Sequence, residues 1–194
     1  TAASEPAAGS TVNLYAYAVP KPGYDKLIPA FQASDAGKGA QFQQSYGPSG
    51  DQSRKVAAGA DADFVNFSVE PDITRLVDAG LVDPSWNSNR YKGIPFGSVV
   101  TIVVRKGNPK GIKDWDDLVK DGVEIITPNP KTSGGARWNF LAAWAYAKKK
   151  YGSDEKALEY VTELYRHAPV LDTGARGATI SFVQRGLGDV LLAW

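Results

Sequence analysis

Residues 123–150 read VEIITPNPKTSGGARWNFLAAWAYAKKK, and this stretch decides the fold. It opens on Val123–Thr127, a short, mostly apolar and β-branched run that predicts a buried strand. A loop with proline, serine and glycine follows, and then a long segment from about Gly135 to Lys150 that predicts a helix. A strand that leads into a helix is the building unit of α/β proteins with a mainly parallel sheet.

The same alternation runs along the rest of the chain. Strands are predicted over residues 12–17, 40–44, 64–67, 98–105, 123–127, 169–171 and 189–193. Helices are predicted over residues 24–32, 52–58, 71–79, 115–119, 135–150, 155–165 and 175–185. Between residues 83 and 97 the sequence turns to Pro, Asn, Ser, Trp and Gly, which marks a boundary. We therefore predict an α/β protein with two lobes, residues 12–96 and residues 97–194.

The bulk composition excludes several classes of function. The chain has 194 residues, 43% of them hydrophobic, so it can bury a core. Its 22 basic and 21 acidic residues leave a net charge of +1, which provides no long-range field for a nucleic acid. With no cysteine and a single histidine, the sequence predicts no disulfide, no metal site and no cofactor.

The residues at both ends of the chain predict how it continues or is attached. Residues 1–11 are almost entirely Ala, Ser, Thr, Gly and Pro, which predicts a flexible tether. Such a tether suits a domain held to a membrane by an N-terminal lipid, although the lipid-bearing cysteine is not in this sequence. No apolar run reaches the roughly 18 residues of a membrane span, and no leader peptide opens the chain, as expected of a mature or trimmed form. The other end stops within an apolar strand at Trp194, which predicts that the sequence is truncated.

Ser133, Gly134 and Gly135 carry the strongest chemical signal. They stand directly ahead of a helix, whose first N–H groups have no partner within the helix and lie at the positive end of its dipole. The glycines leave these groups open to a ligand and Ser133 adds a hydroxyl, so the segment is suited to bind an anion. The alternative is structural: Ser133 only caps the helix, and the glycines only shape the turn.

Two other helix starts repeat this chemistry. QSYGPSGDQSRKVAAG, at residues 44–59, places Ser49 and a glycine before a helix, and LDTGARGATISFVQRG, at residues 171–186, opens a helix with Ala175 between glycines. All three starts follow a predicted strand, and an open α/β sheet binds its ligands at the carboxyl edge of the strands. We therefore expect one start from the first lobe and two from the second to face a single cleft.

The predicted helix after Gly135 also has a predicted core face. Trp138, Phe140 and Trp144 lie at helical spacing and are interpreted as core residues. The lysines at residues 148–150 are interpreted as a solvated helix end, where they complement the negative pole of the dipole.

A site built from amides and hydroxyls offers only hydrogen-bond donors. A fully ionised tetrahedral oxyanion accepts hydrogen bonds only, so it matches such a site. Phosphate near neutral pH usually carries a proton that needs an acceptor, and we expect the site to reject it. Two carboxylates lie beside the three segments. We interpret Asp51 as a residue inside its helix and Asp172 as a helix cap.

Four stretches carry a resemblance to a known family. They are VVRKGNPKGIKDWDDLVK (residues 103–120), ITPNPKTSGGARWNFLAAWAYA (residues 126–147), LDTGARGATISFVQRGLGDVLLAW (residues 171–194) and, more loosely, QSYGPSGDQSRKV (residues 44–56). In combination they resemble bacterial sulfate- and thiosulfate-binding proteins, the receptors of sulfate ABC importers. The resemblance covers most of residues 98–194 and is weaker in the N-terminal half.

The resemblance implies a type II periplasmic-binding-protein fold, in which two α/β lobes close over a dehydrated sulfate, with the first lobe incomplete in this chain. It implies an exported monomer, in the periplasm or at the outer face of the bacterial membrane, that delivers sulfate or thiosulfate to the permease of an ABC importer. The ligand contacts that it implies are the hydroxyls of Ser49 and Ser133, the backbone N–H groups of Ala18, Gly134, Gly135 and Ala175, and the indole N–H of Trp194. Arg137 and Arg176 are expected to orient the amide loops by hydrogen bonds rather than to touch the anion.

The chain departs from the family pattern at two places. Ala18 stands where the family usually has an aspartate, whose contribution is a backbone N–H that alanine retains. Gly47 and Pro48 stand where the family has two glycines, and Pro48 has no N–H, so any donor expected there is lost. Relatives also continue well past Trp194. Molybdate and tungstate, which are acceptor-only dianions of similar size, stay open as ligands.

Two other functions stay open. One is an enzyme that handles a phosphate or sulfate ester and uses the same helix starts to hold it. Against it, the sequence lacks the common nucleophile and phosphate-loop motifs, and its single histidine, His167, is interpreted as a loop residue. The other is a dimerisation or scaffold module, which the repeated Gly-Ser helix starts disfavour.

Overall fold

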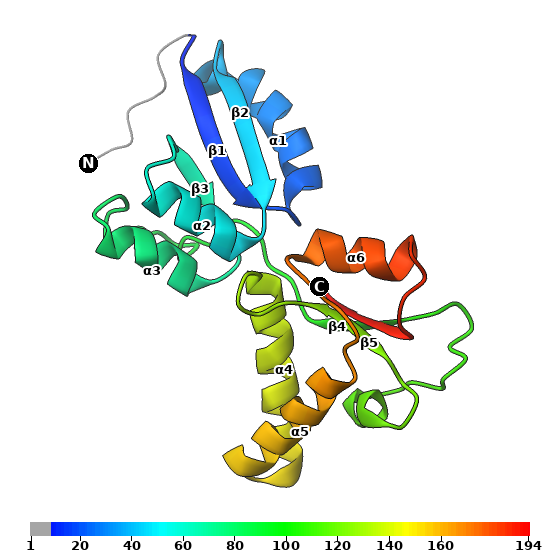
Figure 1. Cartoon of the computed structure of the whole chain (residues 1–194). Helices are drawn as coiled ribbons and strands as arrows, with labels where there is room; N and C mark the ends of the chain where they lie inside the picture. The colour runs from blue at the N-terminus through cyan, green and yellow to red at the C-terminus, as the bar shows by residue number, and fades with distance from the viewer. Residues whose placement is uncertain (1–8) are drawn as a thin grey trace. The chain divides into compact units, whose positions relative to one another are not determined.

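The computed structural model describes residues 9–194, which form two compact units (Figure 1). Unit 1 runs up to Phe96, and unit 2 runs from Gly97 to Trp194. Each unit has its own β-sheet and its own clusters of buried apolar side chains. Most of the predicted tether lies outside the described residues, but its last residue, Thr11, is the first residue of a strand and pairs with Gln41.

Unit 1 is a three-stranded parallel sheet with helices on both faces. Its elements are β1 (Thr11–Tyr17), α1 (Lys21–Gln32), the 3-10 helix η1 (Asp35–Gly37), β2 (Gln41–Gly47), α2 (Ser49–Ala57), β3 (Phe64–Asn66) and α3 (Glu70–Asp78). The strand order is β2-β1-β3. Successive residues of β1 point to opposite faces, so Leu14 and Ala16 pack against α1, while Tyr15 packs with the cluster under α2 and α3.

Unit 2 has a four-stranded sheet that is also covered on both faces. Its elements are β4 (Thr101–Val104), the 3-10 helix η2 (Trp115–Val119), β5 (Ile125–Pro128), α4 (Gly134–Tyr151), α5 (Asp154–Arg166), β6 (Leu171–Asp172), α6 (Ala175–Val183) and β7 (Val190–Ala193). The strand order is β4-β7-β5-β6, with β4 antiparallel to β7 and the other neighbours parallel.

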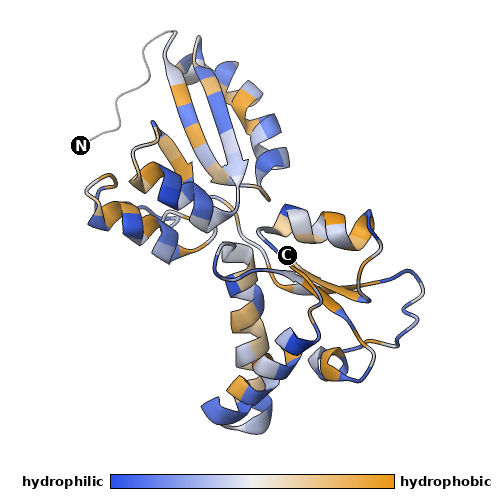
Figure 2. Ribbon diagram, viewed as in Figure 1, coloured by the Kyte–Doolittle hydropathy of each residue, from blue (hydrophilic) through white to orange (hydrophobic). Residues whose placement is uncertain are grey.

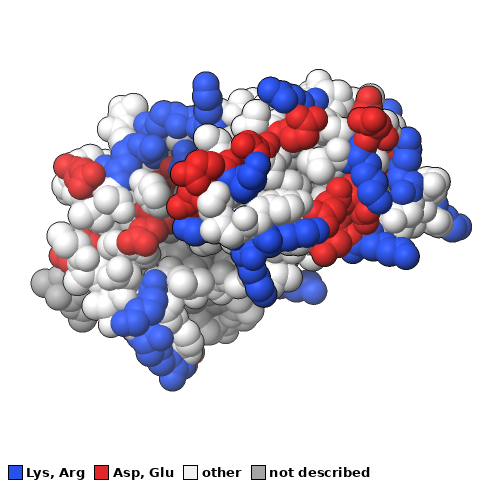
Figure 3. Space-filling model, turned by 90° about the horizontal axis from the view of Figure 1, so that it is seen from below, with Lys and Arg blue, Asp and Glu red and all other residues white. Residues whose placement is uncertain are grey.

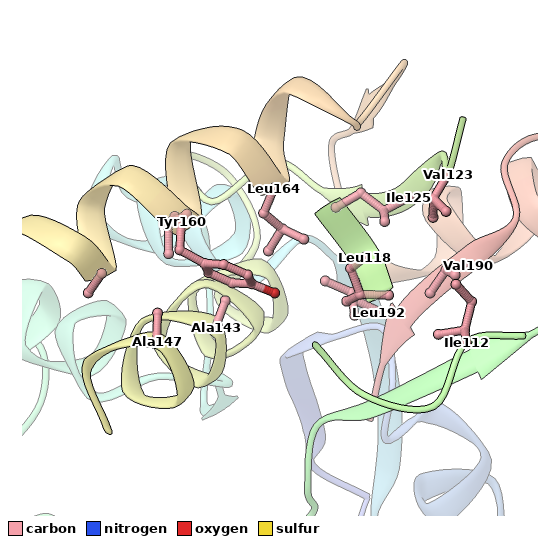
Figure 4. Close-up of a cluster of buried hydrophobic side chains, with 12 residues drawn as sticks. Ile112, Leu118, Val123, Ile125, Ala143, Ala147, Tyr160, Leu164, Val190 and Leu192 are labelled. Atoms are coloured by element: carbon pink, nitrogen blue, oxygen red, sulfur yellow. The ribbon is translucent and has the colours of Figure 1, made fainter. Parts of the chain in front are cut away.

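The strands of unit 2 are apolar on both faces. Ile125 and Leu192 face the large cluster under α4 and α5 (Figure 4), whereas Ile126 and Leu191 face α6. Figure 2 shows the resulting hydrophobic colour along these strands. Parallel strands that helices cover on both sides are expected to have this composition.

The prediction of an α/β fold with mainly parallel strands is confirmed, but several details differ. The strand predicted over residues 98–105 is shorter, Thr101–Val104. Trp138 was predicted to be a core residue but is 44% exposed, whereas Phe140 and Trp144 pack against the core of unit 2. With 3.6 residues per turn, positions two apart lie on nearly opposite faces of a helix, so Trp138 cannot share the buried face with Phe140.

The segment predicted as a helix over Trp115–Val119 is a 3-10 helix, and it begins with a capping box between Asp114 and Asp117. Hydrogen bonds from the side chain of Lys120 and from the backbone N–H groups of Lys113 and Asp114 lower the pKa of Asp117 to about 2. The carboxylate is therefore ionised at neutral pH and fixes this turn.

Arg105, directly after β4, holds the C-terminal end of α6. Its guanidinium donates hydrogen bonds to the carbonyl oxygens of Phe182 (2.8 Å), Leu187 (2.7 Å) and Gly188 (2.8 and 3.0 Å). It also lies 3.7 Å from the centroid of the Phe182 ring. These carbonyls lie in and after the last helical turn, where intrahelical donors run out. The planar guanidinium of an arginine can donate hydrogen bonds to all three carbonyl oxygens at once, and the ammonium group of a lysine cannot.

Replacing Arg105 with lysine is expected to lower the free energy of unfolding by about 2–3 kcal/mol, because each hydrogen bond to a charged group contributes about 1.5–3 kcal/mol. Urea unfolding followed by circular dichroism measures the change. The matched control is Arg185→Lys, at an exposed arginine near the same helix end, for which a change within about 0.5 kcal/mol is expected. Equal losses in the two variants would contradict the role of Arg105.

Candidate functional site

The carboxyl edge of the unit 2 sheet brings three predicted donor segments together. Strands β5, β6 and β7 run parallel, so their carboxyl ends lie at the same edge. Ser133 follows β5, Ala175 follows β6, and Trp194 follows β7. This edge is where an open α/β sheet places its ligand-binding loops.

Ser133 is the N-cap residue of α4. Its backbone is extended (φ −104°, ψ 122°), and its Oγ accepts a hydrogen bond from the N–H of Ala136 at 3.2 Å. This bond uses a lone pair of the hydroxyl oxygen and leaves the hydroxyl proton as a donor. Capping the helix and donating to a ligand are therefore compatible roles for Ser133.

Gly135 and Trp194 are in close contact. A Cβ atom added to Gly135 would lie 2.8 Å from Nε1 of Trp194 and 3.2 Å from its Cε2 and Cζ2 atoms. The first of these distances is shorter than any normal carbon contact, so only glycine leaves room for the indole. The indole nitrogen of Trp194 therefore lies directly beside Gly135, in the first turn of α4.

The start of α6 has no side-chain cap. Its N-cap residue is Gly174, with an extended backbone (φ −157°, ψ 169°), and the first intrahelical bond is from Ala178 N to Gly174 O at 3.1 Å. The backbone N–H of Ala175 thus belongs to the first turn, whose donors have no acceptor within the helix. Arg176 is the next residue, and its side chain is exposed.

Asp172 is not the cap that the sequence suggested. It is the last residue of β6, and its side chain packs against Gly177, where an added Cβ would lie 3.1 Å from the Asp172 Cβ. Its Oδ2 is buried and has no hydrogen-bond partner among residues 9–194. Its backbone carbonyl accepts a hydrogen bond from the N–H of Asn129 at 2.7 Å.

The loop between β5 and α4 is tied down on two sides. Arg137 Nε donates to the carbonyl of Pro130 at 3.0 Å, which is a contact to this loop from within α4. Thr132 Oγ1 donates to the carbonyl of Thr173 at 2.7 Å, which joins the loop to the segment before α6.

The carboxyl edge of the unit 1 sheet places Ala18 after β1 and Ser49 after β2, and these strands end as neighbours at the pair Tyr17 and Gly47. Ser49 is the first residue of α2 rather than a residue ahead of it, and Pro48 occupies the N-cap position. The predicted donor segments of unit 1 therefore share one sheet edge as well.

The hydroxyl of Ser49 already has partners inside unit 1. It donates to Asp72 Oδ2 at 2.7 Å and accepts from the backbone N–H of Ser68 at 3.0 Å, and Ser49 is 2% exposed. Asp72 is fully buried and also accepts a hydrogen bond from Arg75 at 3.1 Å. Sequence reasoning missed Asp72, because an aspartate in the first turn of a helix is common and its contact to Ser49 is long-range.

His167 lies at the other edge of the unit 2 sheet. Its Nδ1 is 2.7 Å from the carbonyl of Val123, which precedes β5, and its Nε2 is 3.3 Å from a carboxylate oxygen of Glu163. Within the described part of the chain, no group of three His, Cys, Asp or Glu side chains is placed to hold a metal ion. None of the helices between residues 9 and 194 is long and apolar enough to cross a membrane.

Charged side chains are mixed in sign. Figure 3 shows one face of the molecule, on which Lys and Arg lie among Asp and Glu without a continuous basic surface. Near the end of α4, Lys148 pairs with Asp154 at 2.9 Å, and Lys150 pairs with Asp116. This face therefore has no basic patch suited to a polyanion.

The model of the family described as "Bacterial extracellular solute-binding protein" matches residues 12–194. The sulfate-binding protein of Synechococcus elongatus is 47% identical over 185 residues, which are 93% of this chain and 53% of the relative. The thiosulfate-binding protein of Pseudomonas aeruginosa is 43% identical over 183 residues, 92% of this chain and 55% of the relative. This chain spans about half the length of these curated relatives.

The solved structure of the sulfate-binding protein SubI from Mycobacterium tuberculosis has a TM-score of 0.91 and 53% sequence identity, and the match covers 95% of this chain and 64% of that chain. The predicted periplasmic-binding-protein fold is thereby confirmed for the part of it that this chain contains. With a family match over residues 12–194, this chain belongs to the bacterial extracellular solute-binding proteins.

Proposed function

We propose that the protein is an extracytoplasmic receptor that binds sulfate or thiosulfate and delivers it to the permease of an ABC importer. One observation carries the proposal: the helix starts at Ser133 and Ala175 and the indole of Trp194 lie at one carboxyl edge of a sheet, with the indole nitrogen against Gly135. These groups can all donate hydrogen bonds to one small guest.

The chemistry of the donors favours a dianion that only accepts hydrogen bonds. Backbone N–H and indole N–H groups are donors without acceptor capacity, and the oxygen of Ser133 already accepts from Ala136. The helix starts of α4 and α6 add the positive ends of two dipoles. Hydrogen bonds from such groups to an ionised oxyanion are charge-assisted, so they can replace the water that the anion loses.

In unit 1, we keep the hydroxyl of Ser49 and the backbone N–H of Ala18 in the proposed ligand set. The proton of Ser49 is bonded to Asp72, so Ser49 donates to an anion only after it leaves that carboxylate. The exchange replaces one charge-assisted hydrogen bond with another, and its net contribution to affinity is therefore expected to be small.

We also keep the orienting roles of Arg137 and Arg176 as proposals. The hydrogen bond from Arg137 to Pro130 supports such a role, because it holds the loop that carries Ser133. For Arg176 the support is only its position in the first turn of α6.

The family supports our proposals on location and ligand. Its description as extracellular supports a place outside the cytoplasm, and we propose the periplasm or the outer face of the cell membrane. The names of the relatives support sulfate and thiosulfate as guests of the same fold. The permease partner, the monomeric state and a lipid anchor ahead of residues 1–11 stay predictions.

An esterase of phosphate or sulfate esters is disfavoured by the position of the single histidine. His167 bonds to Val123 at the amino end of β5, whereas Ser133 follows the carboxyl end of the same strand. Ser133 therefore has no histidine base beside it, which a serine nucleophile of the common type needs.

Isothermal titration calorimetry of the purified protein at pH 7 tests the proposal. Sulfate and thiosulfate are each expected to bind at one site with a dissociation constant in the micromolar range or below, which is about −8 kcal/mol or more favourable. A parallel assay with p-nitrophenyl sulfate is expected to show no turnover. The proposal fails if neither anion binds saturably, or if the ester is hydrolysed.

A further inference from the structure

Asn139 is a buried polar residue that the ligand set does not include. It lies in α4, four residues after Gly135, so the two residues occupy the same face of the helix one turn apart. Asn139 is 1% exposed and points into the sheet of unit 2. Burying the amide of Asn139 costs free energy, and an apolar residue of similar size would avoid this cost because it would bury no polar atom.

The side-chain amide of Asn139 joins three elements. Its Nδ2 donates to Thr127 Oγ1 in β5 at 3.0 Å and to the carbonyl of Leu192 in β7 at 3.0 Å. The Leu192 carbonyl can only accept, so the amide nitrogen must face it, which sets the orientation of the group. One NH2 group therefore ties α4 to β5 and to β7.

This tie lies where the backbone pairing of β5 and β7 stops. The pairing runs through Ile125 with Val190 and Ile126 with Leu191, and the next residue of β5, Thr127, pairs with β6 instead. From Leu192 onward, β7 pairs in the sheet with β4, and the hydrogen bond from Asn139 to the Leu192 carbonyl joins it to α4. Trp194 is only two residues further along the chain.

We propose that Asn139 is a positioning residue for the indole of Trp194. By holding Leu192 at a fixed distance from α4, it sets where the indole meets Gly135, and so makes the indole N–H and the first amides of α4 converge on one point. The unsatisfied Oδ1 of Asn139, buried without a hydrogen-bond partner among residues 9–194, lowers stability and agrees with a role in geometry. The effect on anion binding rests on the proposed function; the effect on the indole does not.

The first test uses the protein without ligand. In 15N-labelled protein each of the five tryptophans gives one indole N–H resonance, and Trp194→Phe identifies the one from Trp194. Asn139→Leu is expected to shift that resonance and to speed its hydrogen exchange, together with a loss of thermal stability, because the Thr127 hydroxyl and the Leu192 carbonyl lose their donor. Thr127→Val, which removes one of the two hydrogen bonds and keeps the other, is expected to give a smaller shift.

Ser181→Ala is the matched control, since Ser181 is 0% exposed, lies in the same unit, and has an Oγ without a hydrogen-bond partner in the described part of the chain. It is expected to leave the Trp194 resonance in place. If Asn139→Leu does not fold, Asn139→Ala carries the same test. An unshifted resonance in a folded Asn139 variant, or an equal shift in Ser181→Ala, overturns the proposal.

The second test separates this inference from the proposed function. Asn139→Leu is expected to weaken sulfate binding at least tenfold, with Ser181→Ala unchanged. If the unaltered protein binds no sulfate, the proposed function fails, and the indole measurement still decides the role of Asn139. If the indole shifts but affinity is unchanged, the convergence on one point is wrong.

Discussion

Replacing Gly135 with leucine is expected to weaken sulfate binding by roughly two to four orders of magnitude while the protein stays folded. Even the Cβ atom of the new side chain would lie 2.8 Å from Nε1 of Trp194, so the indole has to move. The substitution therefore removes the indole donor and blocks the approach to the amide of residue 135. Each lost hydrogen bond to a charged guest is worth about 1.5–3 kcal/mol, so affinity should fall by roughly 10²–10⁴-fold.

Calorimetry with sulfate and thermal unfolding measure these two properties separately. The control is Ala145→Leu, which adds the same apolar bulk to an exposed position of α4 away from its start. It is expected to bind like the unaltered protein. Sulfate binding by folded Gly135→Leu protein with unchanged affinity would show that the donor site at the start of α4 is misassigned.

Sulfate is expected to bind at pH 7 at least about 10³-fold more tightly than phosphate, because sites that leave a buried polar group unpaired reject a close analogue by orders of magnitude. Amide and indole N–H groups cannot accept a hydrogen bond, and the hydroxyl oxygen of Ser133 already accepts one from Ala136, so the proposed donors offer little to the proton that phosphate carries. None of these groups titrates near neutral pH, so the affinity for sulfate should be flat between about pH 5 and pH 9.

Competition calorimetry with both anions over this pH range is the measurement. Phosphate binding within tenfold of sulfate would contradict a site made only of donors. Asp172 would then be the first residue to test, because its Oδ2 is buried and has no partner among residues 9–194, so Asp172→Asn should remove the phosphate binding selectively.

The order of the elements could be predicted from the sequence because it is encoded locally. A short apolar run such as Val123–Thr127 followed by a Gly-rich helix start needs no distant contact to be recognised. Parallel strands then put their carboxyl ends at one edge, which is how Ser133, Ala175 and Trp194 could be expected together.

The contacts that fix those groups could not be predicted, because they join residues far apart in the chain. Ser49 and Asp72 are separated by 23 positions, and Asn139 and Leu192 by 53. No local pattern distinguishes these polar residues from ordinary helix residues. The prediction for Trp138 was wrong for a different reason: Trp138 and Phe140 are two positions apart, so they lie on nearly opposite faces of the helix and cannot both be core residues.

Two hydrogen bonds join the two loops at the edge of the unit 2 sheet. The N–H of Asn129 donates to the carbonyl of Asp172, and Thr132 Oγ1 donates to the carbonyl of Thr173. Their ordering entropy is therefore lost when the chain folds, before any anion arrives. Because these donors are already in place, we expect the rate of binding to be limited by the dehydration of the anion and not by the closure of a loop. Capture on this unit is thus expected to be fast and to produce little change in its backbone.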